Sequence, residues 1–554
     1  MPTEDTALGR IAREVAAAQE EKLRSPPPIH GTARWATVGD ALPLIEANQL
    51  RGTAGTRGLR LGTLLGEDGR DTAMPLVARY PGHLLTVAGT GQGKSATQIV
   101  DNLLHYNGSV VVVDPKGELY DLTAARRRRF GEVYRLAPLA EPGEPPSNHY
   151  NPLDELGGLR DQASRARHLV EMLVVRQGDK GAASATFFEN EAVNLLTAFV
   201  MHIVEVTERP DLRDQRTLAE VRKLCTSPML GKNKQRHKDI REYIEDILMT
   251  MMASKNAFIR GQGAAFSGHD PELLGSFLSE INSNLAFFDG HPGYAEVTGR
   301  SDFLFADLAI RPTTVYLTIP LKRMHTDFRY LRAMVAMAFG ALKEQRDAGE
   351  ASVLFVLDEF AALRDMPFMR DAVAQMRSSG AWFWFFVQDV AQLYGVYDRW
   401  ADVFLSQTDH QIFFGATSDA RTKKHISDNV GVSTFAFRDP NVSWGHTVGT
   451  NEGESIDLTK FGGTSEGRNV GQSVNISNTV TLAPRPLLNA FEVGTFLSER
   501  RQGETHATST IIFSKQANGY PIKARRQHWE QLTQVAQAST NRFVVASTKK
   551  AQAS

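Results

Sequence analysis

Short apolar runs, each followed by a window of helical spacing, recur along most of the chain. Residues 109–113 (SVVVV) form the clearest run, and its continuous β-branched character is typical of a parallel strand buried on both faces. Because helical windows separate several such runs, the pattern predicts an α/β fold with a doubly wound, mainly parallel sheet. The other predicted strands occupy residues 132–136, 313–319, 353–357, 382–387, 411–414 and 508–513.

The pattern changes over residues 155–300, where apolar residues at helical spacing dominate and β-branched runs are few. Leu195, Phe199 and Ile203 follow this spacing. We therefore expect an all-α domain inserted into the α/β domain. The expected divisions are residues 30–154 for the first part of the α/β domain, 155–300 for the helical insertion and 301–528 for the second part.

The flanking segments are polar. Residues 1–29 are expected to form a leader that is partly disordered, with one polar helix ahead of the linker at residues 26–28 (PPP). Residues 433–484 are rich in Gly, Ser, Asn and Thr, which predicts a flexible surface loop. Residues 529–554 are expected to be a loosely ordered tail.

Composition narrows the class of protein. The chain has 554 residues, of which 42% are hydrophobic, and a formal net charge of −1. Net charge therefore neither supports nor excludes nucleic acid as a partner. Cys225 is the only cysteine, which rules out an intramolecular disulfide and a cysteine-based zinc cluster. The N-terminus lacks an apolar signal core, and the most apolar windows are shorter than the roughly 20 residues of a membrane span.

A glycine-rich segment follows the apolar run of residues 84–87 and precedes helix-forming residues. This order of strand, loop and helix is that of a phosphate-binding P-loop, and it argues against a chance glycine loop. Backbone N–H groups would face the phosphates, Lys94 would reach the outer phosphates, and the Ser95 hydroxyl would bind Mg²⁺. The expected nucleotide-binding residues are Gly89, Thr90, Gly91, Gln92, Gly93, Lys94, Ser95 and Ala96.

Two acids end the strand predicted at residues 353–357. Asp358 would hold Mg²⁺ through water, and Glu359 would orient or deprotonate the attacking water. A chance pair of acids is the alternative, but the P-loop lysine and serine make it a poor one. Because such paired acids mark hydrolysis more than transfer to a bound acceptor, we expect an ATPase with Mg²⁺ as its metal.

Other polar residues lie close to the ends of predicted strands. Asp114, Lys116 and Glu118 follow residues 109–113, at the edge where open α/β sheets bind ligands. Gln388 ends the run 382–387 and would contact the γ-phosphate or the water, unless it is an exposed strand-end amide. Arg377 would act in a neighbouring subunit's site as an arginine finger, unless it is simply solvated.

The segment 232–241 (KNKQRHKDIR) is locally basic. A solvated helix face explains it most simply, and a DNA-contacting surface is the alternative. The candidate DNA contacts are Lys232, Lys234, Arg236, Lys238 and Arg241.

With these residues in place, the chain resembles the TraG-type coupling-protein ATPases of type IV secretion and conjugation systems. The matching motifs run in order from about residue 30 to about residue 525. They include GTARW at 31–35, the P-loop, DPKGE at 114–118, NPL at 151–153, SDF at 301–303, Asp358-Glu359, Arg377 with Gly380, Gln388 with Gln392-Leu393, and RPLL at 485–488.

The resemblance implies a RecA/FtsK-like nucleotide-binding domain that carries an all-α domain, and hexameric rings that bind ATP between subunits. It implies partners that include a relaxase with its attached single-stranded DNA, protein effectors and the components of an inner-membrane secretion channel. Arg377 matches the family's candidate finger and Gln388 its third motif. The all-α domain would face the cytoplasm, which gives the basic segment a partner. The choice of ATP over GTP rests on the resemblance alone.

The chain departs from the family in one respect, because members usually begin with transmembrane helices ahead of the region that matches His30. We expect a cytoplasmic form that is peripheral at the inner membrane through a partner; a shortened chain is the alternative. Two further functions remain open. One is a substrate-receptor platform with weak ATPase activity, and the other is a double-stranded DNA translocase of the FtsK/HerA kind, against which the DPKGE and RPLL elements count.

Overall fold

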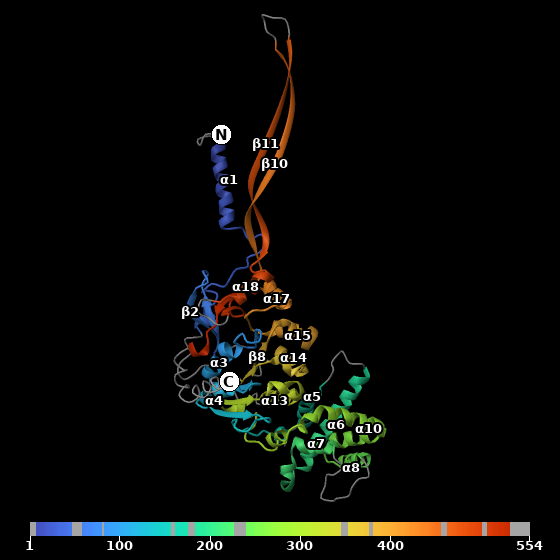
Figure 1. Ribbon diagram of the computed structural model, residues 1–554. Coiled ribbons are helices and arrows are strands. Elements are labelled where there is room, and N and C mark those ends of the chain that lie inside the picture. The colour runs from blue at the N-terminus through green and yellow to red at the C-terminus, as the bar shows by residue number, and fades with distance from the viewer. Residues whose placement is uncertain are drawn as a thin grey trace. The chain divides into compact units, whose positions relative to one another are not determined.

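The computed structural model describes residues 7–46, 58–79, 82–156, 161–175, 183–226, 240–344, 353–375, 380–455, 463–500 and 507–531 (Figure 1). The chain divides into two compact units. One comprises Met1–Arg34 with Lys423–Val493, and the other comprises Trp35–Thr422 with Gly494–Ser554. Each unit is described by itself.

An 11-stranded sheet forms the centre of the larger unit, with the strand order β2-β1-β13-β12-β9-β3-β8-β7-β4-β6-β5. The strands from β9 to β5 are parallel, whereas β12, β13, β1 and β2 extend the sheet in antiparallel fashion. The strands are β1 (Leu59–Leu65), β2 (Asp71–Ala78), β3 (Leu84–Val87), β4 (Ser109–Val113), β5 (Glu132–Leu136), β6 (Thr313–Leu317), β7 (Val353–Leu357), β8 (Ala381–Val387), β9 (His410–Phe414), β12 (Ser509–Ser514) and β13 (Ile522–Arg525).

Helices cover both faces of this sheet. Alternate strand residues such as Val110 and Trp384 share a core with Leu103 of α3 (Val100–His105). On the opposite face the rings of Phe355 and Phe383 lie 4.8 Å apart, and Phe383 lies 5.8 Å from Phe339 of α13 (Met324–Glu344). Because successive side chains of a strand point to opposite faces of the sheet, these apolar strands supply both faces with a core. The predicted doubly wound α/β class is therefore confirmed.

Other helices of this unit are short. They are α2 (Leu42–Glu46), α4 (Glu118–Arg127), α12 (Asp307–Ile310), α14 (Pro367–Gln375), α15 (Val390–Tyr397) and α16 (Ala401–Gln407). The helices α17 (Ala420–Val430) and α18 (Ala490–Ser498) follow later in the chain.

The described residues between β5 and β6 contain helices and no strand. Figure 1 shows α6, α7, α8 and α10 gathered together beyond α5, which packs against α13. Whether this insertion is a separate domain with the boundaries 155–300 stays a prediction. Its elements are α5 (Gln162–Leu173), α6 (Ala183–Val206), η5 (Pro210–Gln215), α7 (Leu218–Thr226), α8 (Ile240–Met252), α9 (Ala257–Ser267), α10 (Pro271–Leu285) and α11 (Gly293–Val297).

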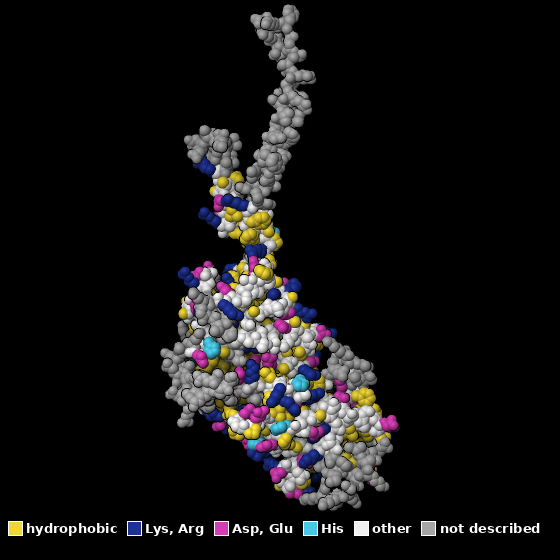
Figure 2. Space-filling model, in the orientation of Figure 1, with side chains coloured by type: hydrophobic (Ala, Val, Ile, Leu, Met, Phe, Trp, Pro, Cys, Tyr) yellow, Lys and Arg dark blue, Asp and Glu magenta, His cyan; other side chains and the backbone are white. Residues whose placement is uncertain are grey.

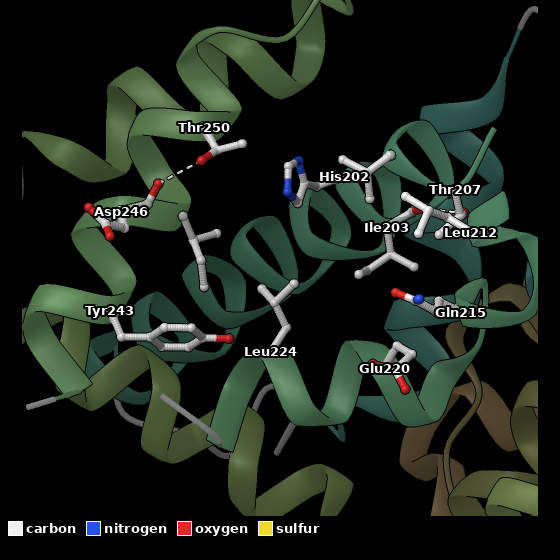
Figure 3. A pocket seen from close by; sticks show the side chains of 12 residues that line it. His202, Ile203, Thr207, Leu212, Gln215, Glu220, Leu224, Tyr243, Asp246 and Thr250 are labelled. Atoms are coloured by element: carbon white, nitrogen blue, oxygen red, sulfur yellow. Dashed lines mark hydrogen bonds between the residues drawn. The ribbon is translucent and has the colours of Figure 1, made fainter. Parts of the chain in front are cut away.

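A pocket of about 340 Å³ lies among α6, α7 and α8 (Figure 3). Its wall combines apolar side chains such as Ile203 and Leu224 with the polar side chains of His202, Glu220 and Asp246. The Nδ1 atom of His202 is buried without a hydrogen-bond partner, and burial lowers the pKa of this imidazole. The ring is therefore neutral at pH 7.

The smaller unit contains α1 (Ala7–Arg24) and a two-stranded antiparallel ribbon of β10 (Val432–Ser455) and β11 (Gly463–Pro486). The ribbon pairs continuously from Val432 with Pro486 to Ser455 with Gly463. The prediction of a loop at residues 433–484 is therefore wrong. The high content of Gly, Ser, Asn and Thr favoured a loop, although Val474, Ile476, Val480 and Leu482 follow the period-two spacing of a strand.

The predicted polar helix of the leader corresponds to α1, where Glu20 forms an ion pair with Arg438 of the ribbon. Within the described part of the chain, no helix has the length and apolar content that crossing a bilayer requires. The tail predicted at residues 529–554 lies almost wholly outside the described residues.

Candidate nucleotide-binding site

The sheet order brings the carboxyl ends of four neighbouring parallel strands to one edge. Val87 of β3 pairs with Val387 of β8, and Leu357 of β7 pairs with Val113 of β4. The residues that follow these strands are the P-loop, Gln388, Asp358 and Asp114. The segments that the sequence singled out are thus adjacent, although they are far apart along the chain.

The P-loop conformation depends on its glycines. Gly91 and Gly93 have φ values of +73° and +78°, which side-chain-bearing residues rarely adopt. The loop leads into a π-helix, η2 (Ser95–Ile99), a rare element that is frequent at functional sites. The Thr97 backbone N–H and hydroxyl both donate to the Gly93 carbonyl, at 2.9 and 2.8 Å. Thr90 and Gly91 are exposed, so the loop is open to a ligand.

Lys94, Glu359 and Gln388 lie together at this edge. The Lys94 Nζ is 3.6 Å from Glu359 Oε1, and Gln388 Nε2 donates to Glu359 Oε2 at 3.3 Å. The Lys94 side chain is only 8% exposed, and its Nζ makes no hydrogen bond. The Lys94 ammonium, buried beside the P-loop with N–H groups that make no hydrogen bond, is suited to binding a phosphate group.

Asp358 also has an unsatisfied atom, because its buried Oδ1 has no hydrogen-bond partner. Burial raises the pKa of Asp358 to about 6; the charge of Glu359 acts in the same direction and Lys94 and Lys116 oppose it. The unpaired carboxylate oxygen and the hydroxyl of Ser95, the residue that follows Lys94, are hard oxygen donors of the kind that Mg²⁺ prefers. These residues therefore fit the predicted metal.

Asp114 has a structural explanation that the sequence did not offer. Its Oδ2 accepts a hydrogen bond of 2.8 Å from the Tyr120 N–H in the first turn of α4. Burial raises the pKa of Asp114 to about 7, although the backbone amides of Tyr120 and Leu119 oppose the shift. Lys116 and Glu118 are exposed beside it. The motif thus fixes the start of α4 at the sheet edge.

Glu359 is held in an unusual backbone conformation, with φ of +62°. A non-glycine residue in this region costs of order 1–3 kcal/mol and persists where the surrounding structure imposes it. The strain places the carboxylate between Lys94 and Gln388.

Arg526 is a site residue that sequence reasoning missed. It follows β13 directly, is 2% exposed, and donates from Nη1 to the Gln92 carbonyl at 3.0 Å and to the Thr97 hydroxyl at 2.9 Å. Its guanidinium carbon lies 3.5 Å from the centre of the Phe414 ring. Arg526 therefore braces the P-loop from the antiparallel part of the sheet, and no local sequence signal distinguishes it from the neighbouring Arg525.

Some predicted site residues cannot be placed. Arg377 lies outside the described residues, as does the basic segment up to residue 239. Arg241 falls in α8. The roles assigned to Arg377 and to Lys232, Lys234, Arg236, Lys238 and Arg241 stay predictions.

A parallel sheet with a glycine-rich phosphate loop after one strand and a catalytic-type acid pair two strands away defines a P-loop nucleotide-binding domain of the RecA kind. The model of the family described as Type IV secretory system Conjugative DNA transfer matches residues 45–552. The chain belongs to this family, and the resemblance drawn from its motifs is confirmed.

Two curated relatives illustrate the match. Protein VirD4 of Agrobacterium fabrum is 28% identical over 420 residues, which cover 75% of this chain and 58% of VirD4. The conjugal transfer protein TraG of Escherichia coli is 28% identical over 410 residues, which cover 70% of this chain and 61% of TraG. The chain therefore spans somewhat more than half the length of these relatives.

Solved structures of a bacterial conjugative coupling protein have the same fold. TrwBΔN70 in complex with sulphate has a TM-score of 0.57 at 14% identity, covering 91% of this chain and 96% of that one. TrwB in complex with ADP and Mg²⁺ has a TM-score of 0.55 at 13% identity, covering 90% and 94%. At this identity the likeness establishes the fold.

Proposed function

We propose that the chain is an ATP-hydrolysing coupling protein that delivers DNA with its relaxase, or protein effectors, to a type IV secretion channel. The observation that carries the enzymatic part is the convergence of Lys94, Glu359 and Gln388 on one sheet edge, with Lys94 Nζ and Asp358 Oδ1 both buried and without a hydrogen bond. Membership of the conjugative DNA transfer family supports the DNA-related part.

The residues divide the work of hydrolysis. The P-loop N–H groups and Lys94 bind the phosphates, and Ser95 and Asp358 hold Mg²⁺, which supplies charge neutralisation when it is bound. Glu359 orients the attacking water and accepts its proton. Gln388 fixes one carboxylate oxygen of Glu359. The Lys94 ammonium lies beside the Glu359 carboxylate in this structure. When Lys94 binds a phosphate instead, that carboxylate becomes available to the attacking water.

We propose further that Arg377 reaches a neighbouring subunit's site in a homo-hexamer, as the family resemblance implies. The protein TrwB has been solved in complex with ADP and Mg²⁺ and with analogues of ATP and GTP. These complexes support a purine nucleoside triphosphate as the ligand here. We favour ATP, with the chain peripheral at the inner membrane through a channel partner.

ATP hydrolysis measured against protein concentration tests this proposal. Lys94→Ala should abolish hydrolysis, whereas Lys322→Ala, at a side chain that is 73% exposed, should not. Wild-type specific activity should rise with protein concentration because the sites form between subunits. Undiminished hydrolysis by Lys94→Ala would refute the catalytic assignment, and a flat concentration profile would refute the role of Arg377 in trans.

A further inference from the structure

Positive charge does not form one continuous field on the described part of the face in Figure 2. Lys and Arg side chains are interspersed there with Asp and Glu, and the formal net charge of the chain is −1. A polyanion would therefore need a local concentration of cationic groups.

Such a concentration surrounds one buried ring, that of Phe328 in α13. The guanidinium carbons of Arg364, Arg329 and Arg332 lie 4.4, 4.9 and 5.9 Å from the centre of this ring. Arg329 and Arg332 come from α13, whereas Arg364 follows the short helix η8 (Phe360–Leu363). Two distant segments thus bring three cationic groups to one place.

Arg332 is the deepest of the three. It is 1% exposed, and both Nε and Nη1 are buried without a hydrogen-bond partner. Burial lowers the pKa of Arg332 to about 10, and Arg329 and Arg364 act in the same direction against Asp365 and Tyr397. Burying a charged donor without an acceptor is costly, and such a group in a native protein calls for a missing partner.

The nearby acceptors are already engaged elsewhere. Asp365 forms an ion pair with Arg370, and Glu280 accepts a hydrogen bond of 2.8 Å from Asn284. Arg329 donates from Nε to Asn284 at 3.2 Å. Among the described residues, the two carboxylates whose charges act on these arginines, Asp365 and Glu280, are thus each also held by another residue.

A planar guanidinium can donate two parallel hydrogen bonds to the oxygens of one phosphate. Arg364 is exposed, so the cluster can be reached from solvent. We propose that Arg329, Arg332 and Arg364 form a binding site for a backbone phosphate of DNA. The choice of DNA as the phosphate source rests on the proposed function. Of the candidate basic segment 232–241, the structure describes only residues 240 and 241, which lie in α8 and not in α13.

The site is connected to the nucleotide edge through one turn of chain. The helix η8 lies between Glu359 and Arg364, whose φ values are +62° and +57°. Phe360 within it is fully buried, and the Tyr397 hydroxyl donates to the Arg364 carbonyl at 3.3 Å. A phosphate that draws Arg364 inward would therefore displace a rigid, strained turn that ends at Glu359. DNA at this site would in this way act on hydrolysis.

Binding of a fluorescein-labelled single-stranded oligonucleotide by the full chain, followed by anisotropy at several salt concentrations, tests the proposal. Arg364→Gln should weaken binding about tenfold and lower the salt slope by about 0.7, the value of one lost phosphate contact. DNA should no longer stimulate ATP hydrolysis by the Arg364→Gln variant. Arg300→Gln, at an arginine that is 69% exposed and outside the cluster, should match the wild type.

Arg332→Gln should have the larger effect on binding, and a thermal melt shows whether that variant is folded. Arg364 is exposed, so Arg364→Gln should fold, and it still tests the proposal if Arg332→Gln does not fold. Wild-type affinity and salt slope in Arg364→Gln would overturn the proposal. Weakened binding of a fluorescent ATP analogue with DNA binding intact would assign the site to free nucleotide phosphate and overturn the choice of DNA. Failure of the proposed function would instead appear in the wild type, as absent ATP hydrolysis.

Discussion

The brace that Arg526 gives the P-loop leads to a sharp prediction for Arg526→Met. This change keeps most of the aliphatic length but removes the hydrogen bonds to the Gln92 carbonyl, the Thr97 hydroxyl and the Ala507 carbonyl. Hydrogen bonds from a charged group contribute about 1.5–3 kcal/mol each, and removing the buried charge recovers part of this sum. We expect the free energy of unfolding to fall by about 2–4 kcal/mol.

Nucleotide affinity should respond as well, because two of these bonds hold the P-loop and the turn that follows it. If they stabilise the binding conformation by about 2 kcal/mol together, their loss weakens binding of a fluorescent ATP analogue with Mg²⁺ by about 30-fold. Titration of the analogue and a denaturant melt measure the two effects on the same sample.

Arg525→Met is the matched control. Arg525 precedes Arg526 directly, but its guanidinium lies 3.2 Å from Asp71 and its side chain is 24% exposed. The same substitution there should cost under about 1 kcal/mol and leave nucleotide affinity unchanged. If Arg526→Met lost stability but bound the analogue as tightly as the wild type, the brace would be structural only and our reasoning on the P-loop would be refuted.

Three further predictions concern single residues. Gln388→Ala removes a hydrogen bond to Glu359 worth about 1 kcal/mol and should slow ATP hydrolysis about fivefold with nucleotide affinity kept; an unchanged rate would contradict this. Gly415→Ala adds a Cβ 2.7 Å from Cγ of Gln92 in the P-loop, at a φ of +79°. Nucleotide affinity and melting temperature should both fall. An unaltered melting temperature would contradict the close packing of Gly415 against Gln92. Burial raises the pKa of Glu155 from 4.5 to about 7, so the folded state binds the proton more tightly than the unfolded state does. The stability due to this group is therefore lost as pH rises from about 4.5 to about 7, and Glu155→Gln should flatten the free energy of unfolding over that range in denaturant melts at several pH values.

Much of the fold followed from the sequence because the signals were local. The run SVVVV and the other apolar runs predicted strands of the parallel sheet within one or two residues of their observed ends. The P-loop glycines before Lys94 and the acids after an apolar strand can also be recognised from a few neighbouring residues. Since parallel strands share one carboxyl edge, strand assignments sufficed to bring Lys94, Glu359 and Gln388 near one another.

What the sequence missed depends on contacts between distant segments. Arg526 meets Gln92 only because β13 joins the far side of the sheet through antiparallel pairing. The cluster around Phe328 likewise needs α13 and the residue after η8 in one place. The ribbon of β10 and β11 was mistaken for a loop because its content of Gly, Ser, Asn and Thr outweighed the period-two spacing of residues such as Val474 and Ile476.

Glu359→Gln tests whether this sheet edge hydrolyses ATP with Glu359 acting on the water. The amide cannot accept the proton, so steady-state hydrolysis should fall by at least about 100-fold. Binding of a fluorescent ATP analogue should be retained, because Lys94 loses only a competing carboxylate. Hydrolysis by Glu359→Gln at the wild-type rate would show that Glu359 is not the residue that activates the water.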